Sequence, residues 1–89
     1  MSVTSTARVN NERGIHARPS SEIARTALKY ESNITIKCED RTASAKDVLQ
    51  LIMLELFEGS NVTIEIDGPD EKEALKEIKN LVEKKYSFD

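Results

Sequence analysis

Two segments of the chain alternate apolar and polar residues with the period of two that is typical of a β-strand with one buried face. Their apolar positions are Ile34, Ile36 and Cys38 in the first segment, and Val62, Ile64 and Ile66 in the second. The first residues alternate more weakly, and residues 41–45 follow Glu39-Asp40 as a short return strand. The pattern therefore predicts four strands, with Cys38 as a small buried hydrophobe and not a reactive thiol.

Three other segments repeat apolar residues at the spacing of an amphipathic helix. The clearest covers residues 70–86 and opens with Asp70 and Glu73 in the form of a capping box. Another covers residues 17–29 and has Pro19 in its first turn, where the missing N–H costs nothing because that donor has no partner within the helix. The third is expected over residues 47–57.

The helix at residues 47–57 is apolar around most of its circumference, and one face of a small sheet cannot bury so many side chains. Either the helix is sunk deeply in the core, or part of it stays exposed as a docking patch. Both interpretations stay open. With this helix in place, the order β-α-β-β-α-β-α predicts an α+β fold in which three helices cover one face of a four-stranded antiparallel sheet.

The chain has 89 residues, which predicts a single domain over residues 1–89. A net charge of −3 argues against nucleic acid as a partner. One cysteine and one histidine cannot form an internal disulfide or supply the ligands of an ordinary zinc site, so we expect no metal and no cofactor. The longest apolar run has four residues, too few to insert into a membrane. We expect a cytoplasmic monomer.

The main candidate for chemistry is His16, the sole histidine of the chain, just ahead of the helix expected at residues 17–29. A helix N-terminus has free N–H groups and a partial positive charge that bind anions such as phosphate. The same charge disfavours the imidazolium form and leaves a neutral ring that can attack phosphorus. Arg18 can hydrogen-bond phosphoryl oxygens, and Gly14 allows close backbone approach. From the residues alone, a capping or surface role for His16 is also open.

The run from Gly14 to Pro19, with the sequence GIHARP, resembles the signature of HPr, the histidine phosphocarrier of the phosphoenolpyruvate-dependent sugar phosphotransferase system. Lys46 ahead of the second helix, Gly59 after it and the length of the last helix also fit. The resemblance implies an open-faced β-sandwich. It also implies that His16 accepts a phosphoryl group from phosphorylated Enzyme I and passes it to an EIIA domain, assisted by Arg18. Such a protein is a carrier and not an enzyme with its own turnover.

The resemblance also implies a partner-binding surface on the first helix and the apolar start of the second. Its candidate residues are Val48, Leu49 and Ile52, with Ser20, Arg25 and Lys46 at the rim. Ordinary core and surface roles for these residues stay open. The alternative function is a regulatory phosphorelay or protein-binding module of the same fold that is not coupled to sugar transport.

Asp47 occupies a position where many family members carry a serine that an ATP-dependent kinase phosphorylates. A carboxylate cannot be phosphorylated by that kinase, so this control is not expected here. Asp is among the strongest N-cap residues, and we expect Asp47 to cap the helix that follows. A fixed negative charge that imitates a phosphoserine is the alternative interpretation.

Overall fold

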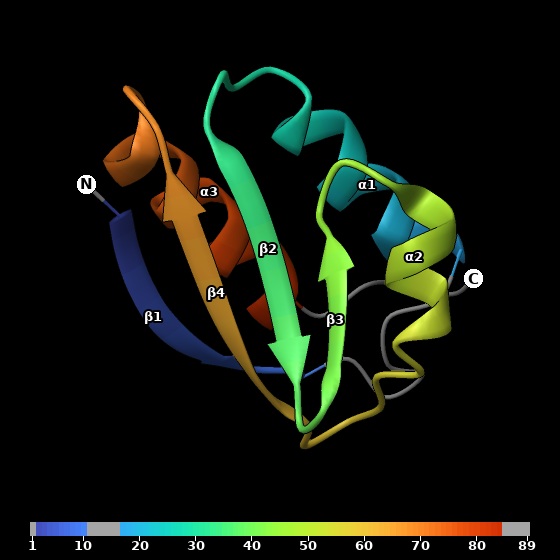
Figure 1. The fold of residues 1–89 in the computed structure, drawn as a ribbon. Helices are drawn as coiled ribbons and strands as arrows, with labels where there is room; N and C mark the ends of the chain where they lie inside the picture. The colour runs from blue at the N-terminus through green and yellow to red at the C-terminus, as the bar shows by residue number, and fades with distance from the viewer. Residues whose placement is uncertain (1, 11–16, 85–89) are drawn as a thin grey trace.

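All three helices lie on one face of a four-stranded sheet (Figure 1). The computed structural model describes residues 2–10 and 17–84. The elements are β1 (Ser2–Arg8), α1 (Ala17–Ala27), β2 (Asn33–Cys38), β3 (Arg41–Ser44), α2 (Val48–Met53), β4 (Asn61–Asp67) and α3 (Glu71–Glu83). This order is the predicted one, and the expected open-faced β-sandwich is confirmed.

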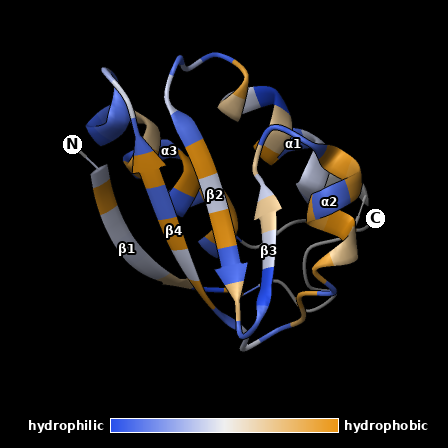
Figure 2. Cartoon of the chain, viewed as in Figure 1, coloured by the Kyte–Doolittle hydropathy of each residue, from blue (hydrophilic) through white to orange (hydrophobic). Residues whose placement is uncertain are grey.

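The strands lie in the order β1-β4-β2-β3, and every neighbouring pair is antiparallel. β4 pairs with β1 on one side and with β2 on the other, where Ile66 lies opposite Ile34. Hydrophobic and hydrophilic residues alternate along β2 and β4 (Figure 2). Because successive side chains of a strand point to opposite faces, the apolar residues share one face, and they are buried in the core. Cys38 lies on this face and is 6% exposed, as predicted.

The core is aliphatic and lies between the sheet and the helices. Its largest fully buried side chains include Ile23 of α1, Leu51 of α2, Ile36 and Ile64 of the sheet, and Ile78 of α3. The other face of the sheet carries polar residues, among them the ion pair of Lys37 and Glu65. Among the described residues the longest helix, α3, has 13 residues, and none is long and apolar enough to cross a membrane.

The second helix is shorter than its apolar pattern predicts. The expected helix ran to Phe57, whereas α2 ends at Met53, with Leu54 as its C-cap. Glu55 then adopts a left-handed backbone conformation with φ 54°, which stops the helix. Leu56 is nevertheless buried, because the chain beyond the helix turns back onto the core. The apolar run therefore continues past the helix without helical structure.

The start of α3 is held by a tertiary contact and not by the capping box predicted from Asp70 and Glu73. Asp70 is the N-cap residue, but its carboxylate makes no capping hydrogen bond. It accepts hydrogen bonds from the backbone N–H groups of Glu31 (2.9 Å) and Ser32 (3.1 Å), and from the Ser32 hydroxyl. The carboxylate therefore ties α3 to the segment that enters β2.

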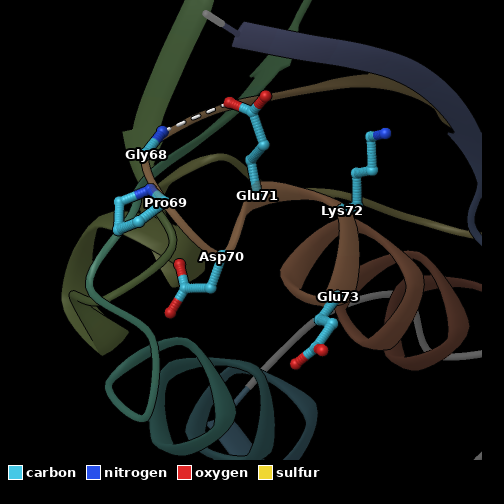
Figure 3. A pocket seen from close by; sticks show the side chains of 6 residues that line it. All are labelled: Gly68, Pro69, Asp70, Glu71, Lys72 and Glu73. Carbon is cyan, nitrogen blue, oxygen red and sulfur yellow. Dashed lines mark hydrogen bonds between the residues drawn. The ribbon is translucent and has the colours of Figure 1, made fainter.

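Gly68 allows the chain between β4 and α3 to lie close to Ser32. In Figure 3 its backbone N–H donates to the Glu71 carboxylate, at 3.3 Å. A Cβ atom on Gly68 would lie 2.5 Å from the Cα atom of Ser32, a clash that only a backbone shift can relieve. Glycine is therefore required where β4 leads into α3.

Asp70→Asn is expected to reduce the dependence of stability on pH in acid. The Ser32 hydroxyl, together with the N–H groups of Glu31 and Ser32, holds the pKa of Asp70 below its ordinary value, against an opposing effect of desolvation. A carboxylate with a lowered pKa in the folded state adds stability above its unfolded pKa, and this stability is lost as the pH falls through the folded value.

Thermal melts from pH 7 down to about pH 2 measure this effect. The difference in Tm between the parent and Asp70→Asn should be largest above about pH 4 and shrink below it. Asp40→Asn, at an exposed position in the β2–β3 turn, is the control and should parallel the parent. A Tm difference between the parent and Asp70→Asn that is the same at all pH values would contradict the lowered pKa of Asp70.

Candidate functional site

His16 lies outside the described residues, as do Arg13 and Gly14, and α1 begins at the next residue, Ala17. Arg18 belongs to the first turn of this helix. Pro19 is buried in the same turn, where a proline is tolerated because the first N–H groups of a helix have no acceptor within it. The expected start of a helix directly after His16 is therefore confirmed.

The family resemblance predicted Ser20 at the rim of the partner-binding surface, and this prediction is wrong. The side chain of Ser20 is fully buried, because residues 20, 23, 24 and 27 form one face of α1 that packs on the core. Among residues 2–10 and 17–84, the Ser20 hydroxyl has no hydrogen-bond partner. Arg25, in the last turn of α1, is exposed and remains available to a partner.

Ser20→Ala is expected to stabilise the protein by about 1 kcal/mol, since a buried hydroxyl without a partner costs about 1–3 kcal/mol and alanine is the better helix former. Chemical denaturation measures the change. Ser21→Ala, at the half-exposed neighbouring position, should not give the same gain. A loss of stability in Ser20→Ala would show that the hydroxyl has a partner in solution.

The start of α2 is capped as predicted. Asp47 has an extended backbone, and its Oδ1 atom accepts from the Gln50 N–H at 3.2 Å. The Gln50 side chain completes the cap, because its Nε2 donates to Asp47 Oδ2 at 3.1 Å and its Oε1 accepts from the Ser44 N–H at 2.9 Å. The carboxylate of Asp47 is therefore engaged in holding the helix start.

Asp47→Ala is expected to lower the free energy of unfolding by about 0.5–2 kcal/mol, the usual cost of losing an N-cap side chain. Asp47→Ser should keep most of the stability, because a serine hydroxyl can accept the same hydrogen bond. Denaturant titration of the two variants measures this difference. If Asp47 acts instead as a phosphoserine mimic, Asp47→Ser should change partner affinity without a change in stability.

One side of α2 presents apolar side chains to solvent. Leu49 is 65% exposed, Met53 66% and Ile52 36%, while Val48 is half-buried. Phe57, beyond the end of the helix, is also 66% exposed. We call Leu49, Ile52, Met53 and Phe57 the α2 patch. The apolar segment is therefore divided, because Leu51 and Leu54 are buried in the core while the α2 patch is exposed.

Met53 and Phe57 were not among the expected interface residues. The spacing of Leu49, Met53 and Phe57, four residues apart, is the signal that places the first two on one side of a helix opposite the buried Leu51. Apart from Phe57, the α2 patch lies on α2, which packs beside α1 (Figure 1). The helix α1 begins directly after His16 in the sequence.

Lys46 is fixed and does not extend into solvent. Its ammonium group donates to the backbone carbonyl oxygen of Tyr30 at 2.9 Å, in a half-buried position beyond the end of α1.

Within residues 2–10 and 17–84, no three His, Cys, Asp or Glu side chains are grouped to hold a metal ion.

Comparison with known proteins agrees with this fold and motif. The family model described as the PTS HPr component phosphorylation site matches residues 3–84. The phosphocarrier protein HPr of Xylella fastidiosa is 31% identical over 81 residues, which are 91% of each chain. The crystal structure of HPr from Bacillus anthracis matches with a TM-score of 0.88 at 28% identity, over 92% of this chain and 98% of that chain.

A second solved structure is Crh, a Bacillus subtilis catabolite repression protein described as an intertwined, domain-swapped dimer. It matches with a TM-score of 0.73 at 28% identity, over 85% of this chain and 87% of that chain. The fold and the matched phosphorylation-site model together define a phosphocarrier of the phosphotransferase system. The chain belongs to the HPr family.

Proposed function

We propose that His16 accepts a phosphoryl group from phosphorylated Enzyme I and passes it to an EIIA-type acceptor of a sugar phosphotransferase system. The observation that carries this proposal is that α1 begins directly after His16 of the GIHARP run and packs beside α2, which has an exposed apolar patch. The free N–H groups at a helix start stabilise an anion, which suits a phosphoryl group on the preceding histidine.

In this proposal a nitrogen of the His16 ring forms the new bond to phosphorus as the bond from phosphorus to the donor breaks. In a second transfer the bond from His16 to phosphorus breaks as the acceptor bonds to phosphorus. Arg18 stabilises the phosphoryl oxygens by charge-assisted hydrogen bonds. The α2 patch and Arg25 contact the partner proteins, with Val48 at the edge of the patch. No cofactor is required, and the protein has no turnover of its own.

Incubation with phosphoenolpyruvate and Enzyme I tests the proposal. Mass spectrometry should show one acid-labile phosphoryl group per chain, and this group should disappear when an EIIA domain is added. A chain that is never labelled would contradict the phosphocarrier function. A labelled chain that no EIIA domain can discharge would contradict only the transfer to EIIA.

The similarity to Crh favours a second candidate, a regulatory module in which phosphorylation changes the affinity for a target protein. It predicts a label on His16 that stays in place and alters binding. We also propose a cytoplasmic location, which suits a single buried free cysteine.

We propose a monomer, because β1 pairs along its whole length with β4 of the same chain and needs no exchange between copies. Light scattering after size-exclusion chromatography tests this. A dimer mass at micromolar concentration would contradict it.

A further inference from the structure

Two adjacent residues, Lys46 and Asp47, bind the ends of two different helices. The Lys46 ammonium donates to the Tyr30 carbonyl oxygen at 2.9 Å, and the Asp47 carboxylate accepts from the Gln50 N–H at 3.2 Å. The first contact lies at the turn that follows α1, and the second caps the N-terminus of α2. Helix ends attract charges of these signs, since carbonyl ends are negative and amide ends positive.

The carbonyl that Lys46 contacts is held firmly. The N–H of Tyr30 donates to the Ala27 oxygen at 3.1 Å, which adds a turn to the end of α1. Burial, and a hydrogen bond to the Glu77 carboxylate of α3, raise the pKa of Tyr30 to about 12. The turn after α1 therefore gives Lys46 its acceptor.

The start of α2 is likewise tied to the sheet. The Asp47 N–H donates to the Ser44 oxygen at 3.2 Å, and the Ser44 N–H donates to the Gln50 side chain at 2.9 Å. These bonds and the contact with Tyr30 restrain the backbone at residues 46 and 47. Its position determines where α2 lies relative to α1.

We propose that Lys46 is a positioning residue for partner docking. Its contact with Tyr30 holds the α2 patch at a fixed place relative to the start of α1, and its ammonium does not itself bind the partner. The inference rests on the proposed function, in which a partner contacts both helices at once. A rigid relation between the two helices lowers the ordering cost of such a contact.

Lys46→Met tests this, because methionine keeps the apolar stem and removes the donor. We expect the KM for the protein as a substrate of Enzyme I to rise about two- to thirtyfold, the range typical of residues that modulate a site without contacting its ligand. The value of kcat should not change, because His16 and Arg18 are untouched. Lys46→Arg should recover much of the affinity, since a guanidinium can donate to the same carbonyl.

Salt separates positioning from direct contact. A charge that binds the partner acts mainly through the association rate, and its effect disappears at about 1 M salt, where the Debye length is ~3 Å. The effect of Lys46→Met should persist there. Lys29→Met, at an exposed lysine near the end of α1, is the matched control for charge and should leave KM unchanged at high salt. Ile78→Val in α3 is the control for lowered stability and should leave KM unchanged throughout.

A readout without any partner makes the test independent of the proposed function. Residual dipolar couplings of the free protein should show a changed orientation of α1 relative to α2 in Lys46→Met and the parent orientation in Lys46→Arg. An unchanged orientation, or a KM effect that vanishes at high salt, would overturn the inference. Failure of the parent protein to accept a phosphoryl group would contradict the proposed function and leave this orientation test in force.

Discussion

The His16→Ala variant is expected to accept no phosphoryl group from Enzyme I. His16 is the only histidine of the chain, and the start of α1 immediately after it provides the N–H groups that favour a bound anion. Alanine removes the nucleophile and fits the same place in the chain. Mass spectrometry after treatment with phosphoenolpyruvate and Enzyme I should show an unmodified variant beside a fully labelled parent.

Arg18→Ala is the companion variant, because it keeps the nucleophile and removes the charge-assisted partner of the phosphoryl group. Transfer should slow roughly 10- to 100-fold, the equivalent of one hydrogen bond to a charged group. Arg25→Ala removes another arginine of α1 from an exposed position and should leave the transfer step itself unchanged. Stable labelling of His16→Ala would place the acceptor elsewhere, and an unchanged rate in Arg18→Ala would make Arg18 an ordinary surface charge.

Patterns local in sequence predicted most of the fold. The alternation in β2 and β4 identified both strands and the buried face of Cys38, because one side of each strand packs on the core. The cap at Asp47 was predictable for the same reason, since its partner Gln50 lies only three residues away. The buried position of Ser20 was also available from its spacing to Ile23, although the family resemblance had placed it at a rim.

Contacts between residues far apart in the sequence could not be predicted from these local patterns. Asp70 and Glu73 have the spacing of a capping box, yet Asp70 bonds to Ser32, 38 residues earlier in the chain. The early end of α2 could not be predicted either, because the apolar run through Phe57 gives no sign of the left-handed residue Glu55. The contact of Lys46 with Tyr30 depends on how α1 and α2 pack, so the sequence showed only a lysine ahead of a helix.

Leu49 and Leu51, two leucines of α2, are expected to give opposite results when they are replaced. Leu51 is fully buried, and Leu51→Ala should lower the free energy of unfolding by about 2–5 kcal/mol through lost contacts and a cavity. Leu49 is 65% exposed, so Leu49→Asp should change the free energy of unfolding by less than about 0.5 kcal/mol. Its cost should fall on partner binding, because a charge in an apolar interface is desolvated without a partner.

Thermal melts run beside binding titrations with Enzyme I separate the two effects. We expect Leu49→Asp to weaken binding about thirtyfold or more, the threshold of an interface hot spot, with Tm nearly unchanged. Leu28→Asp is the matched control, since Leu28 is 66% exposed but lies just beyond the end of α1 and outside the α2 patch. Equal losses of affinity in Leu28→Asp and Leu49→Asp would remove the special role of the α2 patch. A loss of stability in Leu49→Asp with binding intact would return Leu49 to a purely structural role.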